Sequence, residues 1–264
     1  MIFVTGDCHG DFCRFSHALF PEGKHMTKDD YVIICGDFGY WLKSNRMNEV
    51  LDKMDNKPWT TLFVDGNHEN FDGLYQEPVE LWHGGKIHRV RDSVIHLCRG
   101  QYFTDIDGRS IFAFGGASSY DVQGGIFHVK NLDEVLSKEQ LKPSDIREEE
   151  LEDFLKAKMY GEPFRIEHVS WWKEEVPSEK EFETGMENLS KHNFKVDFII
   201  THDGPQSDIS LFSHGTIGPD TTRLYLEEFR ARCDYKRWYF GHHHADVAIN
   251  DKDILLYYDV IRIN

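Results

Sequence analysis

The first half of the chain alternates short apolar runs with longer polar segments. The apolar runs are rich in β-branched residues and each stops at Gly-Asp or Asp-Gly; they are residues 2–5, 31–35 and 61–64. Runs of this kind are typical of strands that are buried on both faces. The polar segments between them, such as residues 43–55, are long enough for crossover helices. The spacing therefore predicts βαβ units and a largely parallel sheet.

A different pattern follows, with strands close together and then a second parallel unit. Closely spaced strands are predicted at residues 86–90, 94–97, 102–106 and 110–114. Asp107-Gly108 between the last two is a strong hairpin signal. The second unit is predicted to contain a strand at 196–200, a helix at 221–233 and a strand at 237–240. At the C-terminal end, residues 247–249 and 254–263 are predicted to form a hairpin that turns at Asn250-Asp251.

Composition and charge narrow the possible classes of protein. The chain has 264 residues, of which 40% are hydrophobic and 14% aromatic, and this predicts a globular fold throughout. The formal net charge of −16 disfavours extended, sequence-independent binding of nucleic acid, because such binding needs many Lys and Arg side chains in a row. An anionic substrate would therefore need cations placed locally, and bound metal ions are one way to supply them.

The chain shows no sign of a membrane or secreted protein. No run of about 18 uncharged apolar residues predicts a transmembrane helix. Residues 1–5 lead directly into a loop of polar ligand-type residues, which leaves no room for a cleavable signal. The five cysteines are odd in number and form no C-x-x-C pair, so we expect reduced thiols and not a disulfide framework or zinc ribbon. The expected location is the cytoplasm.

Residues 131–183 differ from the rest in composition. This segment holds 16 acidic residues against 8 Lys and Arg, so it carries half of the net negative charge of the chain. The acidic run at 148–153 has a helix-like pattern. Two interpretations remain open at this point: a solvated helical insertion, or a lid or dimer surface near the active site.

Five short motifs of metal-ligand type follow the ends of predicted strands. They are Gly6-Asp7-Cys8-His9-Gly10, Gly36-Asp37-Phe38-Gly39, Gly66-Asn67-His68-Glu69, Thr201-His202-Asp203 and Gly241-His242-His243-His244. Such loops lie at the carboxyl edge of a sheet, where α/β proteins bind their ligands. Any one motif could be an ordinary turn. All five in order, each after an apolar strand, indicate a shared site.

This set of motifs resembles the calcineurin-like metallophosphoesterases, whose pattern is GD-x-H-G, GD, GNH-E/D, a single His after a strand, and G-H-x-H. The resemblance extends from Asp7 to His244. It implies an α/β fold, a four-layer sandwich of two mixed β-sheets flanked by helices. We expect residues 1–264 to form one such domain, with the acidic, helical segment at about 131–183 as an insertion.

The resemblance also implies two divalent metal ions and a set of ligands. The ligands would be Asp7, His9 and His244 for the first ion, Asn67, His202 and His242 for the second, and Asp37 bridging both. Oxygen and nitrogen donors of this kind suit manganese, iron or zinc. Two ions about 3.5 to 4 Å apart lower the pKa of a bridging water towards about 7, and the hydroxide attacks the phosphate ester in line. Asp37 would thus be catalytic as well as a ligand.

Other residues near the motifs are given roles by the same resemblance. His68 would protonate the leaving oxygen or bind the phosphate together with Asn67. Asp203 or Glu69 would orient a histidine without binding a metal itself. His243 is expected to point away from the metals.

Cys8 lies within the first motif, where two interpretations remain open. It either packs beneath the loop or approaches the metals.

The substrate class follows from what surrounds the motifs. The protein serine/threonine phosphatases carry Asp-Arg-Gly after their second Asp, whereas Asp37 is followed by Phe38-Gly39-Tyr40, which argues against that activity. Residues 115–121, Arg165 and 170–172, with Glu175 and Pro177, resemble a pattern of small bacterial phosphoesterases. Arg165 would then supply the missing contact to phosphate. Trp171 and Trp172 are either a stacking wall for the substrate or core anchors.

We therefore expect a hydrolase that acts on a phosphorylated small molecule, either a phosphomonoester or a nucleotide-type phosphodiester. One alternative is a nucleic-acid-processing phosphodiesterase, which would need a basic groove. Another is an inactive phosphate-binding protein, which would be expected to lose ligands, although every ligand of the pattern is present.

Overall fold

The computed structural model describes residues 1–40, 45–138 and 140–263. The first two residues of the helix predicted at 43–55 lie outside these ranges, and the described part of that helix is α1 (Asn45–Asp55). Within the described residues, no helix is long and apolar enough to cross a membrane.

The first sheet contains seven strands among the described residues, in the order β15-β1-β2-β3-β6-β5-β4. The strands are β1 (Ile2–Thr5), β2 (Tyr31–Ile34), β3 (Thr60–Phe63), β4 (Val79–Trp82), β5 (Gly85–Arg91), β6 (Val94–Leu97) and β15 (Ile261–Ile263). The pairs from β1 to β6 are parallel and the outer pairs are antiparallel, so the sheet is mixed. The predicted parallel units form its centre.

The second sheet is also mixed, with six strands in the described residues in the order β13-β14-β12-β11-β8-β7. The strands are β7 (Gln101–Ile106), β8 (Arg109–Phe114), β11 (Lys195–Thr201), β12 (Asp234–Phe240), β13 (Val247–Ala248) and β14 (Asp253–Leu255). Strands β8, β11, β12 and β14 run parallel, and β7 and β13 are antiparallel edges.

The predicted C-terminal hairpin is wrong in its second arm. The arm predicted at 254–263 is two strands in two different sheets: β14 pairs with β13, whereas β15 pairs with β1. Between them, the Asp246 carboxylate accepts hydrogen bonds from the backbone N–H groups of residues 257, 258 and 259. Because this side chain takes three successive donors, the chain leaves the second sheet and crosses to the first.

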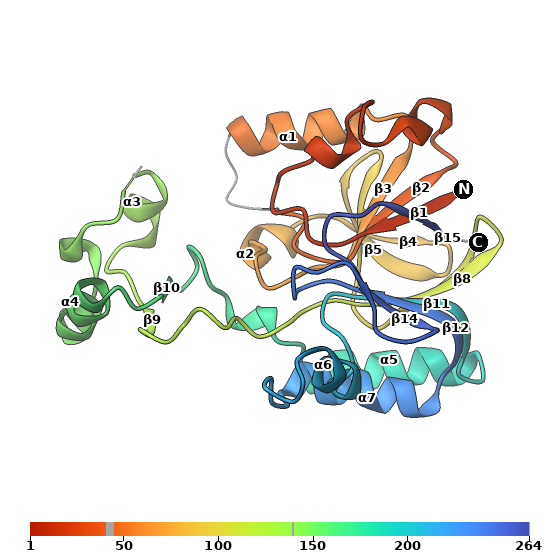
Figure 1. The fold of residues 1–264 in the computed structure, drawn as a ribbon. Coiled ribbons are helices and arrows are strands. Elements are labelled where there is room, and N and C mark those ends of the chain that lie inside the picture. The colour runs from red at the N-terminus through yellow and green to blue at the C-terminus, as the bar shows by residue number, and fades with distance from the viewer. Residues whose placement is uncertain (41–44, 139, 264) are drawn as a thin grey trace.

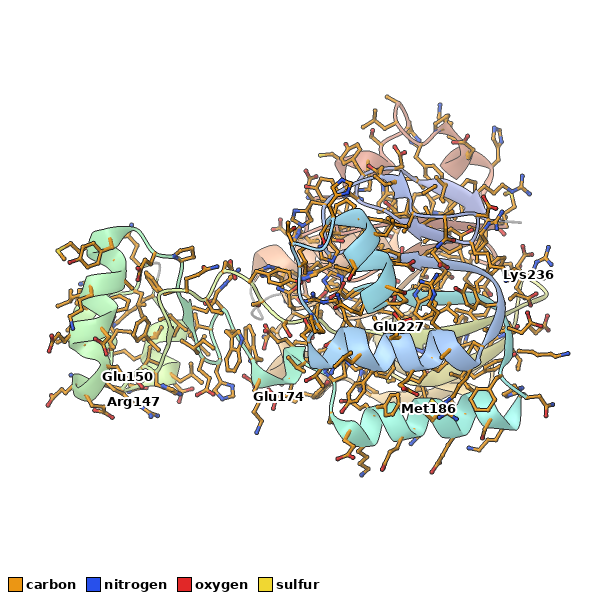
Figure 2. All side chains as sticks on the ribbon, turned by 60° about the horizontal axis from the view of Figure 1, so that its bottom comes forward. Arg147, Glu150, Glu174, Met186, Glu227 and Lys236 are labelled. Carbon is orange, nitrogen blue, oxygen red and sulfur yellow. The ribbon has the colours of Figure 1, made fainter. Side chains whose placement is uncertain are left out.

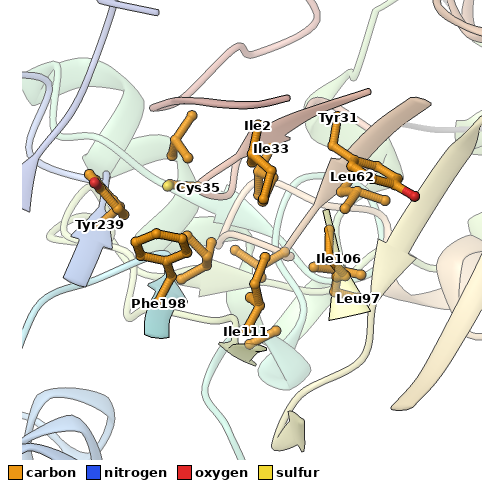
Figure 3. Close-up of a cluster of buried hydrophobic side chains, with 14 of the residues drawn as sticks. Ile2, Tyr31, Ile33, Cys35, Leu62, Leu97, Ile106, Ile111, Phe198 and Tyr239 are labelled. Carbon is orange, nitrogen blue, oxygen red and sulfur yellow. The ribbon is translucent and has the colours of Figure 1, made fainter. Parts of the chain in front are cut away.

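Helices cover the outer face of each sheet (Figure 1). Helix α1 packs on the first sheet. Helices α5 (Glu179–Lys191), α6 (Gln206–Phe212) and α7 (Thr221–Arg232) pack on the second, and the short α2 (Phe71–Leu74) follows β3. Between the sheets lies an apolar cluster that includes Ile33, Leu62, Ile111 and Phe198 (Figure 3). The order helix, sheet, sheet, helix confirms the expected four-layer α/β sandwich.

A small lobe projects from the sandwich on the side of the helix α2 (Figure 1). It contains β9 (Ile126–Phe127), α3 (Leu132–Leu136), α4 (Leu151–Tyr160) and β10 (Arg165–Ile166). The lobe has its own apolar cluster, centred on Phe127, Phe154 and Ile166. The bounds expected for the insertion, about 131–183, stay a prediction. In the structure β9 belongs to the lobe, and α5 packs against β7 of the sandwich.

Candidate metal centre

All five motifs lie immediately after strands, at the edge where the two sheets meet. Asp7, Asp37 and Asn67 follow the neighbouring strands β1, β2 and β3 of the first sheet. His202 and His242 follow the neighbouring strands β11 and β12 of the second sheet. Because these strands are parallel within each sheet, their carboxyl ends bring the motifs together.

The backbone of these loops is strained. His9, Asp37, His242 and His244 have positive φ angles of 47°, 44°, 70° and 47°. This conformation is uncommon for residues with a side chain and clusters at functional sites. Gly36 has φ +91°, and a Cβ there would lie 2.1 Å from Nδ1 of the buried His202 ring. Only glycine lets the chain pass so close to that ring.

Asp7, His9 and His244 form one half of the site. Nε2 of His244 lies 3.2 Å from Oδ2 of Asp7 and 3.0 Å from Nε2 of His9. The other oxygen of Asp7 accepts a hydrogen bond of 2.9 Å from the His242 backbone N–H. One ligand atom from each of the three side chains lies within 4.8 Å of the others, which is close enough for a single ion to bind all three. His9 and His244 are partly exposed, so this half opens to solvent.

Asn67 and His202 form the core of the other half. Nδ1–H of His202 donates to the carbonyl of Cys35 at 2.8 Å, so Nε2 of a neutral ring is an acceptor. That atom lies 3.1 Å from Oδ1 of Asn67, whose amide Nδ2 donates to Ser119. Two acceptors thus face each other at hydrogen-bond distance. A cation between them, either a proton on the ring or a metal ion, would satisfy both acceptors.

The charges around His202 favour a cation in this place. Burial of the ring lowers the pKa of His202, but the carboxylates of Asp37 and Asp7 outweigh it, and the net shift is upward. The site attracts positive charge by itself.

Asp37 lies between the two halves. Its Oδ2 is 3.7 Å from Nε2 of His9 and 3.6 Å from Nε2 of His202. Its Oδ1 accepts a hydrogen bond of 2.8 Å from the His68 backbone N–H, which fixes the carboxylate. A carboxylate can bind two ions, whereas an imidazole nitrogen cannot, and the position of Asp37 agrees with a bridging ligand.

Two buried atoms of the site form no well-aligned hydrogen bond within the described residues: Nε2 of His242, and Oδ2 of Asp7, which has only the ion-pair contact of 3.2 Å to His244. Leaving a buried polar atom unpaired costs about 1 to 3 kcal/mol. Burial lowers the pKa of His242 to about 3, so its ring is neutral and its lone pair is free. Both atoms belong to the predicted ligand set, and a donor set of carboxylate, amide and imidazole fits two divalent ions.

Comparison with known proteins agrees with this geometry. A family model described as calcineurin-like phosphoesterase matches residues 1–246. This chain belongs to the calcineurin-like phosphoesterase family. The resemblance inferred from the five motifs is thereby confirmed. The matched region includes the phosphoesterase motifs on both sheets and the lobe.

The chain is also similar to one curated protein, lariat debranching enzyme A from Xenopus laevis. The two are 27% identical over 169 residues, which cover 55% of this chain and 32% of that enzyme. The chain therefore matches about a third of the length of this relative.

His68 lies between His9 of the candidate metal centre and Arg165 of the lobe. Its ring centroid is 5.3 Å from that of His9, and its Nδ1 lies 3.4 Å from Nη2 of Arg165. Burial lowers the pKa of His68, which favours the neutral form of the ring. If Nδ1 accepts from Arg165, the ring carries its proton on Nε2 and can donate it. Arg165 is also paired with the carboxylate of Asp121, and it comes from β10 of the lobe.

One of the two carboxylates expected to orient a histidine does contact one, although this histidine is not a predicted ligand. Asp203 lies 2.9 Å from Nε2 of His243, and it also forms an ion pair with Arg223. His243 thus points away from the predicted ligands, as expected. Glu69 accepts hydrogen bonds from the backbone N–H groups of residues 38 and 40, so it shapes the loop of Asp37 and orients no histidine.

Cys8 and Trp172 have packing roles in the structure. Cys8 lies in the apolar cluster between the first sheet and α1, and burial raises the pKa of its thiol to about 12. The indole of Trp172 is buried and donates a hydrogen bond of 2.7 Å to Asp72 on α2. This bond fastens the end of the lobe to the sandwich.

Sequence reasoning missed one part of the candidate metal centre, the support of Asn67. The Asn67 amide donates to Oγ of Ser119 at 3.0 Å, and Ser119 donates both its backbone N–H and its hydroxyl to the carboxylate of Glu175 at 2.7 Å. Glu175 is buried, and its burial raises its pKa to about 7. Both residues lie in the segments that resemble small bacterial phosphoesterases, but nothing in the spacing links them to Asn67.

This support predicts an effect on metal binding. Glu175→Gln should weaken metal binding about 10- to 100-fold, because it disturbs the hydrogen bonds that aim Oδ1 of Asn67 into the site. Competition with a chelator of known affinity would measure the change. Glu174→Gln is the matched control, since that neighbour lies outside the chain of bonds to Asn67. Unchanged affinity in Glu175→Gln would show that Asn67 does not depend on this support.

Proposed function

We propose that this protein hydrolyses phosphate esters in a site that holds two divalent metal ions. The observation that carries the proposal is that ligand atoms of Asp7, His9, Asp37, His202 and His244 lie in two groups, each with its atoms within 4.8 Å of one another. Oδ1 of Asn67 lies 3.1 Å from Nε2 of His202, and the His242 ring, whose Nε2 has no hydrogen-bond partner within the described residues, has its centroid 4.9 Å from that of His202. The ligands would be Asp7, His9 and His244 for one ion, Asn67, His202 and His242 for the other, and Asp37 for both. Manganese, iron and zinc all suit this donor set.

When bound, the ions would make a nucleophilic water available near neutral pH and neutralise charge on the phosphoryl oxygens. The protein supplies the positions of the groups. Asp37 is held by the His68 backbone, and Asn67 is held by Ser119. These bonds hold the Asp37 carboxylate and Oδ1 of Asn67 in orientations suited to metal binding before substrate binds.

His68 and Arg165 are proposed to act on the substrate itself. His68 carries its ring proton on Nε2 when Nδ1 accepts from Arg165, so it can donate to the leaving oxygen or to a phosphoryl oxygen. The guanidinium of Arg165 can bind phosphate as a two-pronged donor once it releases Asp121. Asn67 lies beside them and is proposed to contact the substrate as well as the metal.

The lobe is proposed to control access to the site. Arg165 lies on β10, which pairs in parallel with β9, so the lobe places this side chain beside His68. The lobe and the rest of the protein are acidic, with a formal net charge of −16 for the chain. These features favour a small phosphomonoester or a nucleotide-type phosphodiester over a long polyanion.

A second candidate function is a phosphodiesterase that acts on nucleic acid. The similarity to a lariat debranching enzyme favours it. The acidic composition opposes it, because sequence-independent binding of nucleic acid comes from rows of Lys and Arg.

Hydrolysis of simple aryl esters tests the proposal and separates the candidates. Manganese-loaded protein should hydrolyse para-nitrophenyl phosphate or its bis ester, and Asp37→Asn should abolish that activity. If neither ester is cleaved by a protein that holds its metal, the proposal of a small-ester hydrolase fails. Cleavage of a branched or linear oligonucleotide without cleavage of either aryl ester would favour the second candidate.

The proposed role of Arg165 predicts a defect in substrate binding. Arg165→Ala should lower kcat/KM by about 10- to 100-fold, because a hydrogen bond to a charged group contributes about 1.5 to 3 kcal/mol. Steady-state kinetics with para-nitrophenyl phosphate would show the change. Arg147→Ala is the matched control, since Arg147 lies on the same lobe, far from the sandwich (Figure 2). Equal effects of the two substitutions would show that Arg165 acts through the fold of the lobe and not on phosphate.

A further inference from the structure

A second cluster of metal-ligand side chains lies in the first sheet, apart from the seven residues above. His88 on β5, His96 on β6 and Cys98 after β6 each offer one ligand atom, and these three atoms lie within 4.8 Å of one another. His88 and His96 are buried and Cys98 is half-buried. The five sequence motifs include none of them.

The strand register explains why the three side chains meet. Strands β5 and β6 are antiparallel, and His88 is directly opposite His96. Their rings are stacked with centroids 5.2 Å apart and 8° between the planes. Cys98 follows His96 by two residues, so the two side chains leave the strand on the same face. The cluster is therefore fixed by the pairing of two strands and not by a mobile loop.

The hydrogen bonds of His96 direct a lone pair into the cluster. Nε2 of His96 lies 3.0 Å from Oδ1 of Asp65, whose other oxygen binds the buried guanidinium of Arg99 at 2.8 Å. A carboxylate paired in this way is an acceptor, so Nε2 of His96 carries the proton and Nδ1 carries the lone pair. A carboxylate that orients a histidine through its outer nitrogen is the usual support of a histidine metal ligand.

The distances inside the cluster suit a tetrahedral ion. Nδ1 of His88 lies 2.9 Å from Nδ1 of His96 and 3.7 Å from Sγ of Cys98. Ligand atoms around a tetrahedral zinc ion, with bonds of about 2.0 to 2.1 Å to nitrogen and 2.3 Å to sulfur, are about 3.3 to 3.6 Å apart. Small movements of the side chains would therefore form the site. A cavity of about 230 Å³ borders all three residues and has room for a water molecule as fourth ligand.

We propose that His88, His96 and Cys98 bind one zinc-class transition-metal ion, with a water from the cavity completing the tetrahedron. Two imidazoles and a thiolate select zinc or cobalt over magnesium, calcium or manganese. On binding, the sulfur–hydrogen bond of Cys98 breaks, the proton passes to solvent, and the sulfur electron pair forms the bond to the metal. His96 is bonded to Asp65, which lies two residues before Asn67. The ion would therefore link β5 and β6 to the segment that carries Asn67.

Cobalt(II) is the probe for this site. A cobalt–thiolate bond gives a charge-transfer absorption in the near ultraviolet that oxygen and nitrogen ligands do not give. The seven residues of the candidate metal centre include no cysteine, so cobalt bound there adds nothing to this band. The full chain should show the band on titration with cobalt(II), and Cys98→Ser and His88→Gln should each remove or strongly reduce it. Cys233→Ser, which changes another half-buried cysteine, should keep it.

A second measurement on the unmodified protein covers the case in which the variants fail to fold. When zinc exceeds its dissociation constant 100-fold, about 1% of the sites stay free, so alkylation of Cys98 should slow about 100-fold and recover with a chelator. The exposed Cys13 should react at the same rate throughout. If cobalt gives no thiolate band, if the band survives Cys98→Ser, or if zinc leaves the alkylation of Cys98 unchanged, the three residues form a hydrogen-bonded cluster only and the proposal is overturned.

Discussion

His242→Ala is expected to lower metal occupancy and hydrolysis together. The substitution removes a neutral, buried nitrogen that has no hydrogen-bond partner within the described residues, on a ring whose centroid lies 4.9 Å from that of His202. Loss of a direct ligand should weaken the second ion by more than the roughly 100-fold that follows loss of a supporting residue. Hydrolysis should fall at least about 10³-fold, because the metal supplies several kcal/mol of transition-state stabilisation.

The neighbouring histidine provides the control for His242. His243→Gln changes an adjacent ring in the same loop, but this ring binds Asp203 and not the centre. Elemental analysis after dialysis, together with the rate on para-nitrophenyl phosphate, should separate the two variants. If His243→Gln loses metal and His242→Ala keeps it, the assignment of the two histidines is reversed.

His68→Ala should give the opposite pattern, with both ions kept and turnover reduced by about 10²- to 10⁴-fold, the range of general acid-base help. In the structure His68 contributes its backbone N–H to Asp37, and alanine keeps that bond. The loss should be smaller for esters with acidic leaving groups, because a good leaving group needs little protonation. A series of aryl phosphates of decreasing leaving-group pKa measures this dependence.

Two results would contradict a role of His68 as general acid. Loss of metal in His68→Ala would make it a ligand or a support of Asp37. Equal slowing of good and poor leaving groups would leave it a phosphate-binding residue that works with Arg165. His25→Ala, which changes an exposed histidine at the end of the short helical turn Pro21–His25, is the matched control and should change neither metal content nor rate.

Much of the fold follows from local pattern. The apolar runs at 2–5, 31–35 and 61–64 became β1, β2 and β3, because buried parallel strands need continuous apolar residues and tolerate little else. The hairpin signal at Asp107-Gly108 became the turn between β7 and β8. The five motifs were predictable for the same reason, since each is tied to the end of a strand.

The C-terminal strands were not predictable from local pattern. Residues 254–263 look like one strand arm, but whether the chain continues in one sheet or crosses to the other depends on Asp246, which takes three backbone donors of the crossing segment. Sequence spacing gives no sign of such a bond. The path of the chain after β14 depends on a contact between two segments, and local periodicity cannot predict such a contact.

The same limit applies to the support of the site. Glu175 and Ser119 lie 56 positions apart, and only the packing of the segment before α5 against the strand end of β8 brings them together beside Asn67. His88, His96 and Cys98 meet through strand register, which spacing alone could not fix. Motif reasoning found residues that lie in loops with unusual composition. It missed residues whose role depends on their partners.

Metal stoichiometry tests the central claim most directly. Manganese is the appropriate ion for the count, because it favours oxygen and imidazole ligands and is held poorly by a thiolate site. Protein purified without chelator, reloaded with manganese and passed through a desalting column should contain two ions per chain, and Asp37→Asn should contain fewer. One manganese ion per chain or less after reloading would contradict a two-metal centre built from these seven side chains.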